Sequence, residues 1–320
     1  MEKEFTWSIL VPIDLFLGGL SGGTFIVSIL ADLSRKEAYQ SIAKFGAWIA
    51  PFPLLVGILS LIFDLGRPLR FWHLLIYFNP TSVMSLGVIF LNIFGVLSTA
   101  YAFLWWADTT KMAQDLSKRL FFPVGDLLSW IIKEGRVLRW PIGLVGLFSG
   151  AAVGLYTGAL ISACSFNPVW SSPLMPLLFH TSAVSTGIAL LILVTYFLRA
   201  KDREKRHALG VLGLLDALLI LIGLECFILG SLFLGWHTTG HVGAKAIEVF
   251  FTGGYYLWVW IGVVLVGLLI PFFLGLYGFL SVYYKKKETH EAIPAIIASL
   301  GVLIGGFILR YVIIFSGQSV

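Results

Sequence analysis

Cysteine is almost absent from this sequence. Only Cys164 and Cys226 occur, and they lie far apart without a CxxC spacing. This scarcity argues against a disulfide framework and against an iron–sulfur or zinc site, because both need several side chains at characteristic spacings. We expect no metal ligands in this chain, so any redox metal would belong to a partner.

Charged residues are also scarce. They make up 12% of the 320 residues, whereas hydrophobic residues make up 58%. So much apolar surface cannot be buried in one water-soluble core, which predicts an integral membrane protein. The net charge of +5 does not indicate nucleic acid, because the basic residues fall between apolar runs. Walker-type and GxGxxG loops in a strand-to-helix context are missing, so nucleotide binding has no support.

Eight apolar windows are each long enough, at about 20 residues, to cross a bilayer as a helix. The first begins without a basic flank or a small-residue cleavage site, which predicts a retained span and no removable signal peptide. The predicted fold class is an all-α integral membrane protein with eight transmembrane helices in a single membrane domain, 1–320. The windows are Ile9 to Ala31, Ile42 to Phe63, Val83 to Trp106, Pro141 to Ala163, Leu174 to Leu198, Ala208 to Leu234, Gly253 to Tyr283 and Ala292 to Phe315.

The tripeptide FNP occurs twice, at 78–80 and 166–168. The echo suggests two four-helix bundles with halves 1–163 and 174–320, although Asn-Pro before a helix is also ordinary turn chemistry. In the first window, GGLSGG at Gly18 to Gly23 allows either close helix packing or room for a flat ligand, and packing is the commoner use of such residues.

Lysine and arginine are distributed unevenly between the two sides of the predicted membrane. The segments after the first, third, fifth and seventh windows hold sixteen, and the other tails and loops hold four. By the positive-inside rule both termini face outward, to the periplasm or its equivalent. The longest inner segment, 107–140, mixes charges with Leu and Phe and is predicted as an amphipathic helix on the inner membrane surface.

Ionisable and polar side chains inside the windows are the functional candidates. Inserting a charged side chain into the membrane interior costs about 2.5–3.5 kcal/mol on translocon scales, so such residues are rarely present without a role. They share a position in the outward half of their windows, which suggests one polar site. The set comprises Asp14, Asp64, Tyr156, His180, Glu225 and Arg310.

Each candidate also has a simpler interpretation. Asp64 could form a helix-end ion pair with Arg67, Tyr156 and His180 could be satisfied interior residues, and Arg310 could snorkel to the head groups. Asp14 and Glu225 are harder to explain as structural residues, because carboxyl groups inside a hydrophobic helix can carry protons near neutral pH. Asp216, nine residues before Glu225, could extend a proton path toward the inner side.

A haem site is not expected. Of the six histidines only His180 lies securely inside a window, and a bis-histidine haem needs two buried partners on facing helices.

Three motifs carry a family resemblance. The run DLGRPLRFWHLLIYFNPTSVMSLG from Asp64 to Gly87, together with DLFLGGLSGG from Asp14 and YTGALIS from Tyr156, resembles the NrfD/PsrC family of membrane subunits of polysulfide reductase-type complexes. The resemblance implies a haem-free, eight-helix subunit that binds menaquinone or another quinone. It also implies two partners, a periplasmic ferredoxin-like iron–sulfur subunit and a molybdopterin catalytic subunit.

The same resemblance assigns roles within the chain. Asp64 and Tyr156 match family positions near the quinone head, and Asp14 stands where members carry a histidine or asparagine. We therefore predict Asp14, Asp64 and Glu225 as catalytic acids or bases. The predicted quinone-binding residues are Asp14, Asp64, Arg67, Tyr156 and His180, with Arg67 holding Asp64 through a charge-assisted bond.

The predicted function is electron and proton exchange between the quinone pool and an extracytoplasmic partner, at the outer face of the inner membrane. Two alternatives stay open: an ion- or proton-coupled secondary transporter, with Asp14, Glu225 and Arg310 as its site, and a purely structural membrane anchor. The terminal substrate stays open too, among polysulfide, thiosulfate, tetrathionate, arsenate and nitrite.

Overall fold

The computed structural model describes residues 7–110, 124–164, 167–198, 205–285 and 292–319, and every element in them is a helix. Eight helical segments are long and apolar enough to cross a membrane, which confirms the all-α class and the eight predicted spans. The spans are Leu10–Leu33, Glu37–Asp64, Val83–Thr109, Val137–Ser162, Met175–Leu198, Gly210–Thr238, Trp258–Ser281 and Ala292–Gln318.

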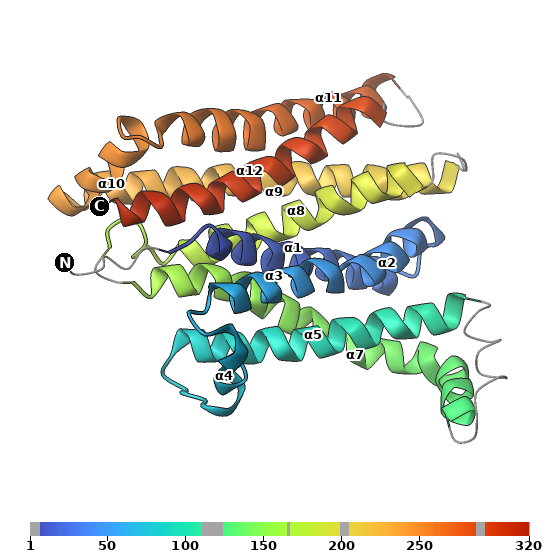
Figure 1. The fold of residues 1–320 in the computed structure, drawn as a ribbon. Coiled ribbons are helices and arrows are strands. Elements are labelled where there is room, and N and C mark those ends of the chain that lie inside the picture. The colour runs from blue at the N-terminus through green and yellow to red at the C-terminus, as the bar shows by residue number, and fades with distance from the viewer. Residues whose placement is uncertain (1–6, 111–123, 165–166, 199–204, 286–291, 320) are drawn as a thin grey trace.

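The long helices run side by side along one direction, and both termini lie at the same end of the molecule (Figure 1). We call the end that holds Trp7 and Gln318 the terminal end, and the end where the first helix turns at Arg35 the far end. The elements are α1 (Leu10–Leu33), α2 (Glu37–Ile49), α3 (Pro51–Asp64), η1 (Pro68–Arg70), α4 (His73–Ile76), α5 (Val83–Thr109), α7 (Val124–Ser162), α8 (Met175–Leu198), α9 (Lys205–Thr238), α10 (His241–Phe251), η2 (Trp258–Leu269), α11 (Ile270–Lys285) and α12 (Ala292–Gln318).

Helix α1 lies at the centre and packs against α3, α7 and α8. Its glycines allow this, because a Cβ at Gly22 would lie 2.6 Å from the carbonyl oxygen of Gly150 in α7, and one at Gly23 would overlap the carbonyl of Ala183 in α8. The GGLSGG motif therefore serves close helix packing, and the flat-ligand interpretation is not supported at Gly22 and Gly23.

The second span consists of two helices. α2 ends at Ile49, and α3 begins with Pro51 at its first position, where a missing N–H is tolerated. The Ser21 hydroxyl of α1 donates a hydrogen bond of 2.5 Å to the carbonyl of Ala50 at the junction. The break leaves α3 free to present Asp64 at the terminal end.

The seventh span begins in an unusual way. Trp258–Leu269 forms a π-helix before α11 continues the span. A Cβ at Gly262 would lie 2.9 Å from Ile308, and one at Gly267 would lie 2.8 Å from the Cα of Gly305, so small residues bring this segment against α12. Pro271 suggests a kink in this span, and the structure shows a change of helix type just before it instead.

The segment 107–140, predicted as an amphipathic helix on the inner membrane surface, lies partly in two longer helices. α5 runs on to Thr109, and the described part of the segment, from Val124, is the first part of α7 and continues through Pro141 to Ser162. Residues 111–123 lie outside the described residues. The N-terminal part of α7 turns away from the long part at the far end (Figure 1).

At the terminal end, contacts join segments that are far apart in the sequence. The Trp7 amide donates to Gln318 Oε1 at 2.9 Å, and the Trp7 ring stacks on Trp170 with 4.9 Å between centroids. Trp170 Nε1 in turn donates to the Ile313 carbonyl at 2.7 Å. The residues that precede α1 are thus held beside the end of α12.

Candidate functional site

Three of the predicted site residues meet near the terminal end. Asp14 lies in the second turn of α1, Asp64 is the last residue of α3, and Tyr156 lies in the last third of α7. Asp14 interacts electrostatically with both of the others. Gly57 of α3 faces it, since a Cβ there would lie 3.1 Å from Asp14 Oδ1. We call Asp14, Asp64 and Tyr156 the acid–tyrosine cluster.

Asp14 and Tyr156 are buried, with 7% and 8% of their surface exposed. The Asp14 carboxyl and the Tyr156 hydroxyl form no hydrogen bond with any residue that the structure describes. Leaving a buried polar group unpaired costs about 1–3 kcal/mol, so such groups usually have a partner. The two side chains therefore offer hydrogen-bonding capacity to a molecule that enters between the helices.

The Tyr156 ring is held by the neighbouring helix. A Cβ at Gly87 of α5 would overlap the ring carbons and the hydroxyl oxygen of Tyr156. Only glycine lets α5 approach the ring this closely. The position of the phenol thus depends on a residue 69 positions earlier in the sequence.

Asp64 has a different partner from the predicted one. Its Oδ1 accepts a hydrogen bond from the hydroxyl of Ser8, just before α1. Arg67 is exposed, and within the described ranges no ion pair joins it to Asp64. The backbone leaves the helix at Leu65 in an extended conformation, so Arg67 lies outside α3 rather than in its last turn.

His180, in the second turn of α8, packs against α7. A Cβ at Gly154 would be 2.7 Å from His180 Nδ1. Its Nδ1 is buried and has no hydrogen-bond partner among the described residues, so His180 stays a candidate to bind a ligand.

Glu225 belongs to a second cluster, formed by α8, α9 and α12. It is 5% exposed, and its Oε1 accepts a hydrogen bond of 2.5 Å from Ser185. Arg310 is an electrostatic partner of Glu225. We call Glu225, Ser185 and Arg310 the glutamate–arginine cluster.

Arg310 is fully buried, so the suggestion that it snorkels to the head groups is wrong. Its guanidinium donates to the Gly306 carbonyl at 2.8 Å, to the Ser182 hydroxyl at 3.2 Å and to the Leu15 carbonyl of α1 at 3.3 Å. Leu15 adjoins Asp14 in the sequence. Arg310 therefore connects the glutamate–arginine cluster to the helix that carries Asp14.

A third cluster, at the far end, was not recognised from the sequence. Arg139 Nε of α7 lies 3.0 Å from Asp32 Oδ2 of α1, and Arg139 Nη1 lies 3.4 Å from Asp108 Oδ2 of α5. Tyr101 donates a hydrogen bond of 2.8 Å to Asp32, and Arg139 stacks on Trp105 at 3.9 Å. We call Asp32, Asp108 and Arg139 the ion-pair cluster. The available signals were an aspartate at the end of the first apolar run and an arginine directly before the fourth.

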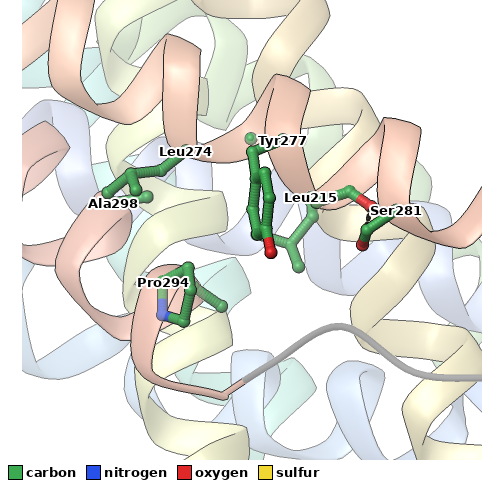
Figure 2. A pocket seen from close by; sticks show the side chains of 9 residues that line it. Leu215, Leu274, Tyr277, Ser281, Pro294 and Ala298 are labelled. Atoms are coloured by element: carbon green, nitrogen blue, oxygen red, sulfur yellow. Dashed lines mark hydrogen bonds between the residues drawn. The ribbon is translucent and has the colours of Figure 1, made fainter. Parts of the chain in front are cut away.

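The hollow shown in Figure 2, between α9, α11 and α12, is not a candidate for a quinone. Leu215 and Tyr277 meet in it, and Ser281 donates a hydrogen bond of 2.8 Å to the Gly278 carbonyl. Its volume of about 10 Å³ is roughly what one water molecule occupies. An aromatic head group does not fit there.

Sequence comparisons cover the full length of the protein. The profile of the family "Polysulphide reductase, NrfD" matches residues 1–320. The C subunit of the polysulfide reductase of Wolinella succinogenes is 33% identical over 98% of this sequence and 94% of its own length. The NrfD homolog of Haemophilus influenzae is 29% identical over 98% of this sequence and 95% of its own.

A more distant relative has a name that includes its quinol. The Hdr-like menaquinol oxidoreductase integral membrane subunit of Archaeoglobus fulgidus is 25% identical over 86% of this sequence and 64% of its own length. The relatives thus include named subunits of a polysulfide reductase and of a menaquinol oxidoreductase.

Proposed function

Because this multi-pass membrane chain belongs to the NrfD polysulphide reductase family, we propose that it is the quinone-reactive membrane subunit of a respiratory oxidoreductase complex. In this role it exchanges two electrons and two protons between the quinone pool and an extracytoplasmic partner. The names of the relatives, a polysulfide reductase subunit and a menaquinol oxidoreductase subunit, support the reaction class and favour menaquinone.

The observation that carries the proposal is that two buried side chains, Asp14 and Tyr156, interact electrostatically and form no hydrogen bond with the described residues. A quinone carbonyl accepts hydrogen bonds, and during reduction its oxygen gains negative charge and then a proton. The Tyr156 hydroxyl can donate to one carbonyl and stabilise that charge. The Asp14 carboxyl can give or take the proton, since acid–base catalysis needs a group within hydrogen-bonding reach.

Asp64 would form the rim of the quinone site. It lies at the end of α3, bonded to Ser8, and is more exposed than Asp14, with which it interacts electrostatically. A proton released at Asp14 can therefore pass to water by way of Asp64. Arg67, exposed three residues later, is placed to contact the partner subunit or lipid head groups rather than to hold Asp64.

The partners and orientation follow from charge and family. The positive-inside bias predicts that the terminal end faces the periplasm or its equivalent. A ferredoxin-like iron–sulfur subunit would then dock beside the acid–tyrosine cluster and exchange electrons with a molybdopterin catalytic subunit. The active face of the complex would be extracytoplasmic.

Glu225 would act at a distance from the quinone. Its neighbour Arg310 bonds to the Leu15 carbonyl, one residue from Asp14, so a proton at the glutamate–arginine cluster would influence the quinone site through α1. Asp216, nine residues earlier on α9, is about 13 Å nearer the far end at 1.5 Å per residue. A proton path from Asp216 to Glu225 remains part of the proposal. A quinone contact for His180 remains part of it too, because its buried Nδ1 has no partner among the described residues.

The test uses the complete complex, purified with its partners, and follows quinol-dependent turnover. Tyr156→Phe removes one hydroxyl, and we expect kcat/KM for quinol to fall about tenfold, the value of one hydrogen bond of about 1.4 kcal/mol. Tyr196→Phe, a partly buried tyrosine toward the far end of α8, is the matched control and should match the wild type. Equal turnover in both variants, with unchanged quinone content after extraction, would rule out the site.

A further inference from the structure

The far end contains a hollow that has no part in the proposed quinone reaction. Its volume is about 460 Å³, within the range of roughly 300–1,000 Å³ that ligand sites occupy. The ion-pair cluster forms part of its wall. Arg35 and Trp140 line it as well, and both are exposed, so the hollow opens to the surface.

The hollow lies at the level of one membrane surface. Asp32 is in the last turn of α1, Asp108 in the last turn of α5, and Arg139 only two residues inside the span Val137–Ser162. Trp140, 46% exposed, stands at the rim, and tryptophan is typical of the boundary between lipid and water. Val137, 70% exposed, continues the apolar surface into the span.

The described residues of the wall carry charges of both signs. Arg139 is engaged by Asp32 and Asp108, at 3.0 and 3.4 Å. Arg35 is a second cation, and its guanidinium makes no hydrogen bond or ion pair with the residues that the structure describes. Gln40, which carries a neutral amide, also lines the hollow. Two arginines and two aspartates favour a ligand that carries both a positive and a negative charge.

We propose that this hollow binds the head group of a phospholipid that carries both a phosphate and a primary amine, as phosphatidylethanolamine does. The phosphate pairs with Arg35 and Gln40, and the ammonium group points to Asp108. A primary ammonium donates three hydrogen bonds, whereas the quaternary amine of choline donates none. The acyl chains leave past Trp140 and Val137, which accounts for the apolar side of the rim.

A lipid held there would tie three helices together. α1, α5 and α7 each contribute a charged residue to the wall, and α1 also carries Asp14 at its other end. A ligand that binds only the folded protein raises its thermal stability. The lipid is therefore expected to act as a clamp on the helices that hold the acid–tyrosine cluster.

The test measures thermal unfolding of the full-length protein after delipidation, with phosphatidylethanolamine, phosphatidylcholine or phosphatidylglycerol added back. We expect the ethanolamine lipid to raise Tm by several degrees more than the other two, and native mass spectrometry to show it bound. Arg35→Gln should lose this bound lipid, and the neighbouring Lys36→Gln should keep it. Asp108→Asn should abolish the difference in Tm between ethanolamine and choline lipids. Both Tm values are measured on the same variant, so a change in its own stability does not affect their difference.

Three outcomes would overturn the proposal. One is an equal rise in Tm with the choline or glycerol lipid. Another is undiminished lipid retention in Arg35→Gln. The third is an equal rise with phosphoethanolamine alone, which would show that the hollow takes a soluble ligand and no lipid. None of these depends on quinone turnover, so they leave the proposed function untouched.

Discussion

Helix α1 carries one aspartate near each end, and the two have opposite surroundings. Asp32 at the far end accepts a hydrogen bond from Tyr101 and pairs with Arg139. Asp14, about 27 Å away at 1.5 Å per residue, is just as buried but receives no hydrogen bond from the described residues and has a second carboxylate, Asp64, as its electrostatic neighbour.

The difference indicates two uses of the same side chain. A buried carboxylate with a cation and a phenol around it is held in one charge state and joins helices together. A buried carboxyl group without a counter-ion can exchange a proton with whatever binds beside it. The terminal end is therefore expected to lose activity on mutation, and the far end to lose stability.

The largest expected effect is on turnover at the terminal end. Asp14→Asn keeps the size of the side chain but removes the proton donor, so we expect quinol-dependent kcat of the complex to fall about 10³-fold, within the range for a lost acid–base group. Asp126→Asn, an exposed aspartate at the far end of α7, is the control. Comparable kcat in the two variants would contradict the role of Asp14.

The next effect is on stability at the far end. Arg139→Gln removes the cation that Asp32 and Asp108 share, and breaking a buried pair from one side lowers the free energy of unfolding by about 3 kcal/mol. The measurement is Tm of the purified protein in detergent, with the exposed Lys133→Gln on the same helix as control. The double variant Asp32→Asn/Arg139→Gln should recover part of the loss. If it is no more stable than the single variant, the pairing is not what holds this end.

A smaller effect tests the geometry around Tyr156. Gly87→Ala adds a methyl group that overlaps the Tyr156 ring, and such overpacking lowers the free energy of unfolding by about 1–3 kcal/mol. The ring must move to make room, so its hydroxyl is displaced from the quinone and we expect kcat/KM for quinol to fall about tenfold. Gly95→Ala on the same helix is the matched control, because its Cβ would lie 3.4 Å from Leu54, an ordinary contact. Similar losses in both variants would point to general damage to α5.

The smallest effect concerns which end faces outward. Burial raises the pKa of the Cys164 thiol, near the terminal end, so less thiolate is present at neutral pH and maleimide labelling should be slower than for a free cysteine. The rate should rise as the pH is raised toward the thiol pKa. In intact cells carrying Cys226→Ser, an impermeant maleimide should label Cys164, whereas a cysteine introduced by Lys36→Cys should need permeabilised cells. The reverse pattern would falsify the proposed orientation.

Much of the architecture could be predicted from the sequence. The eight apolar windows became eight spans, because a run of about 20 apolar residues has few alternatives to a membrane helix. Boundaries were less predictable. The second span consists of two helices joined at Ala50, and α7 begins at Val124, well before the predicted start at Pro141. Packing and local hydrogen bonds decide where a helix begins, and the sequence pattern does not show them.

The site was predicted in part. Asp14 interacts electrostatically with Asp64 and Tyr156, as the predicted shared site requires, but Asp64 accepts a hydrogen bond from Ser8 and forms no ion pair with Arg67 among the described residues. The sequence places these residues at similar depths, and depth follows from position along a span. Which side of a helix faces which neighbour depends on packing, and two residues along a helix change direction by about 200°.

The sequence by itself determined that this is a membrane protein of eight helices in the NrfD family, because length, apolarity and three motifs are local properties. Only the tertiary structure decided that, among the described residues, Asp14 has no counter-ion while Asp32 has one. The partners of Asp32, Arg139 and Tyr101, lie 107 and 69 residues away in the sequence and reach it only when α1, α5 and α7 pack together. The tertiary packing thus explains why two similar aspartates on one helix have different expected roles.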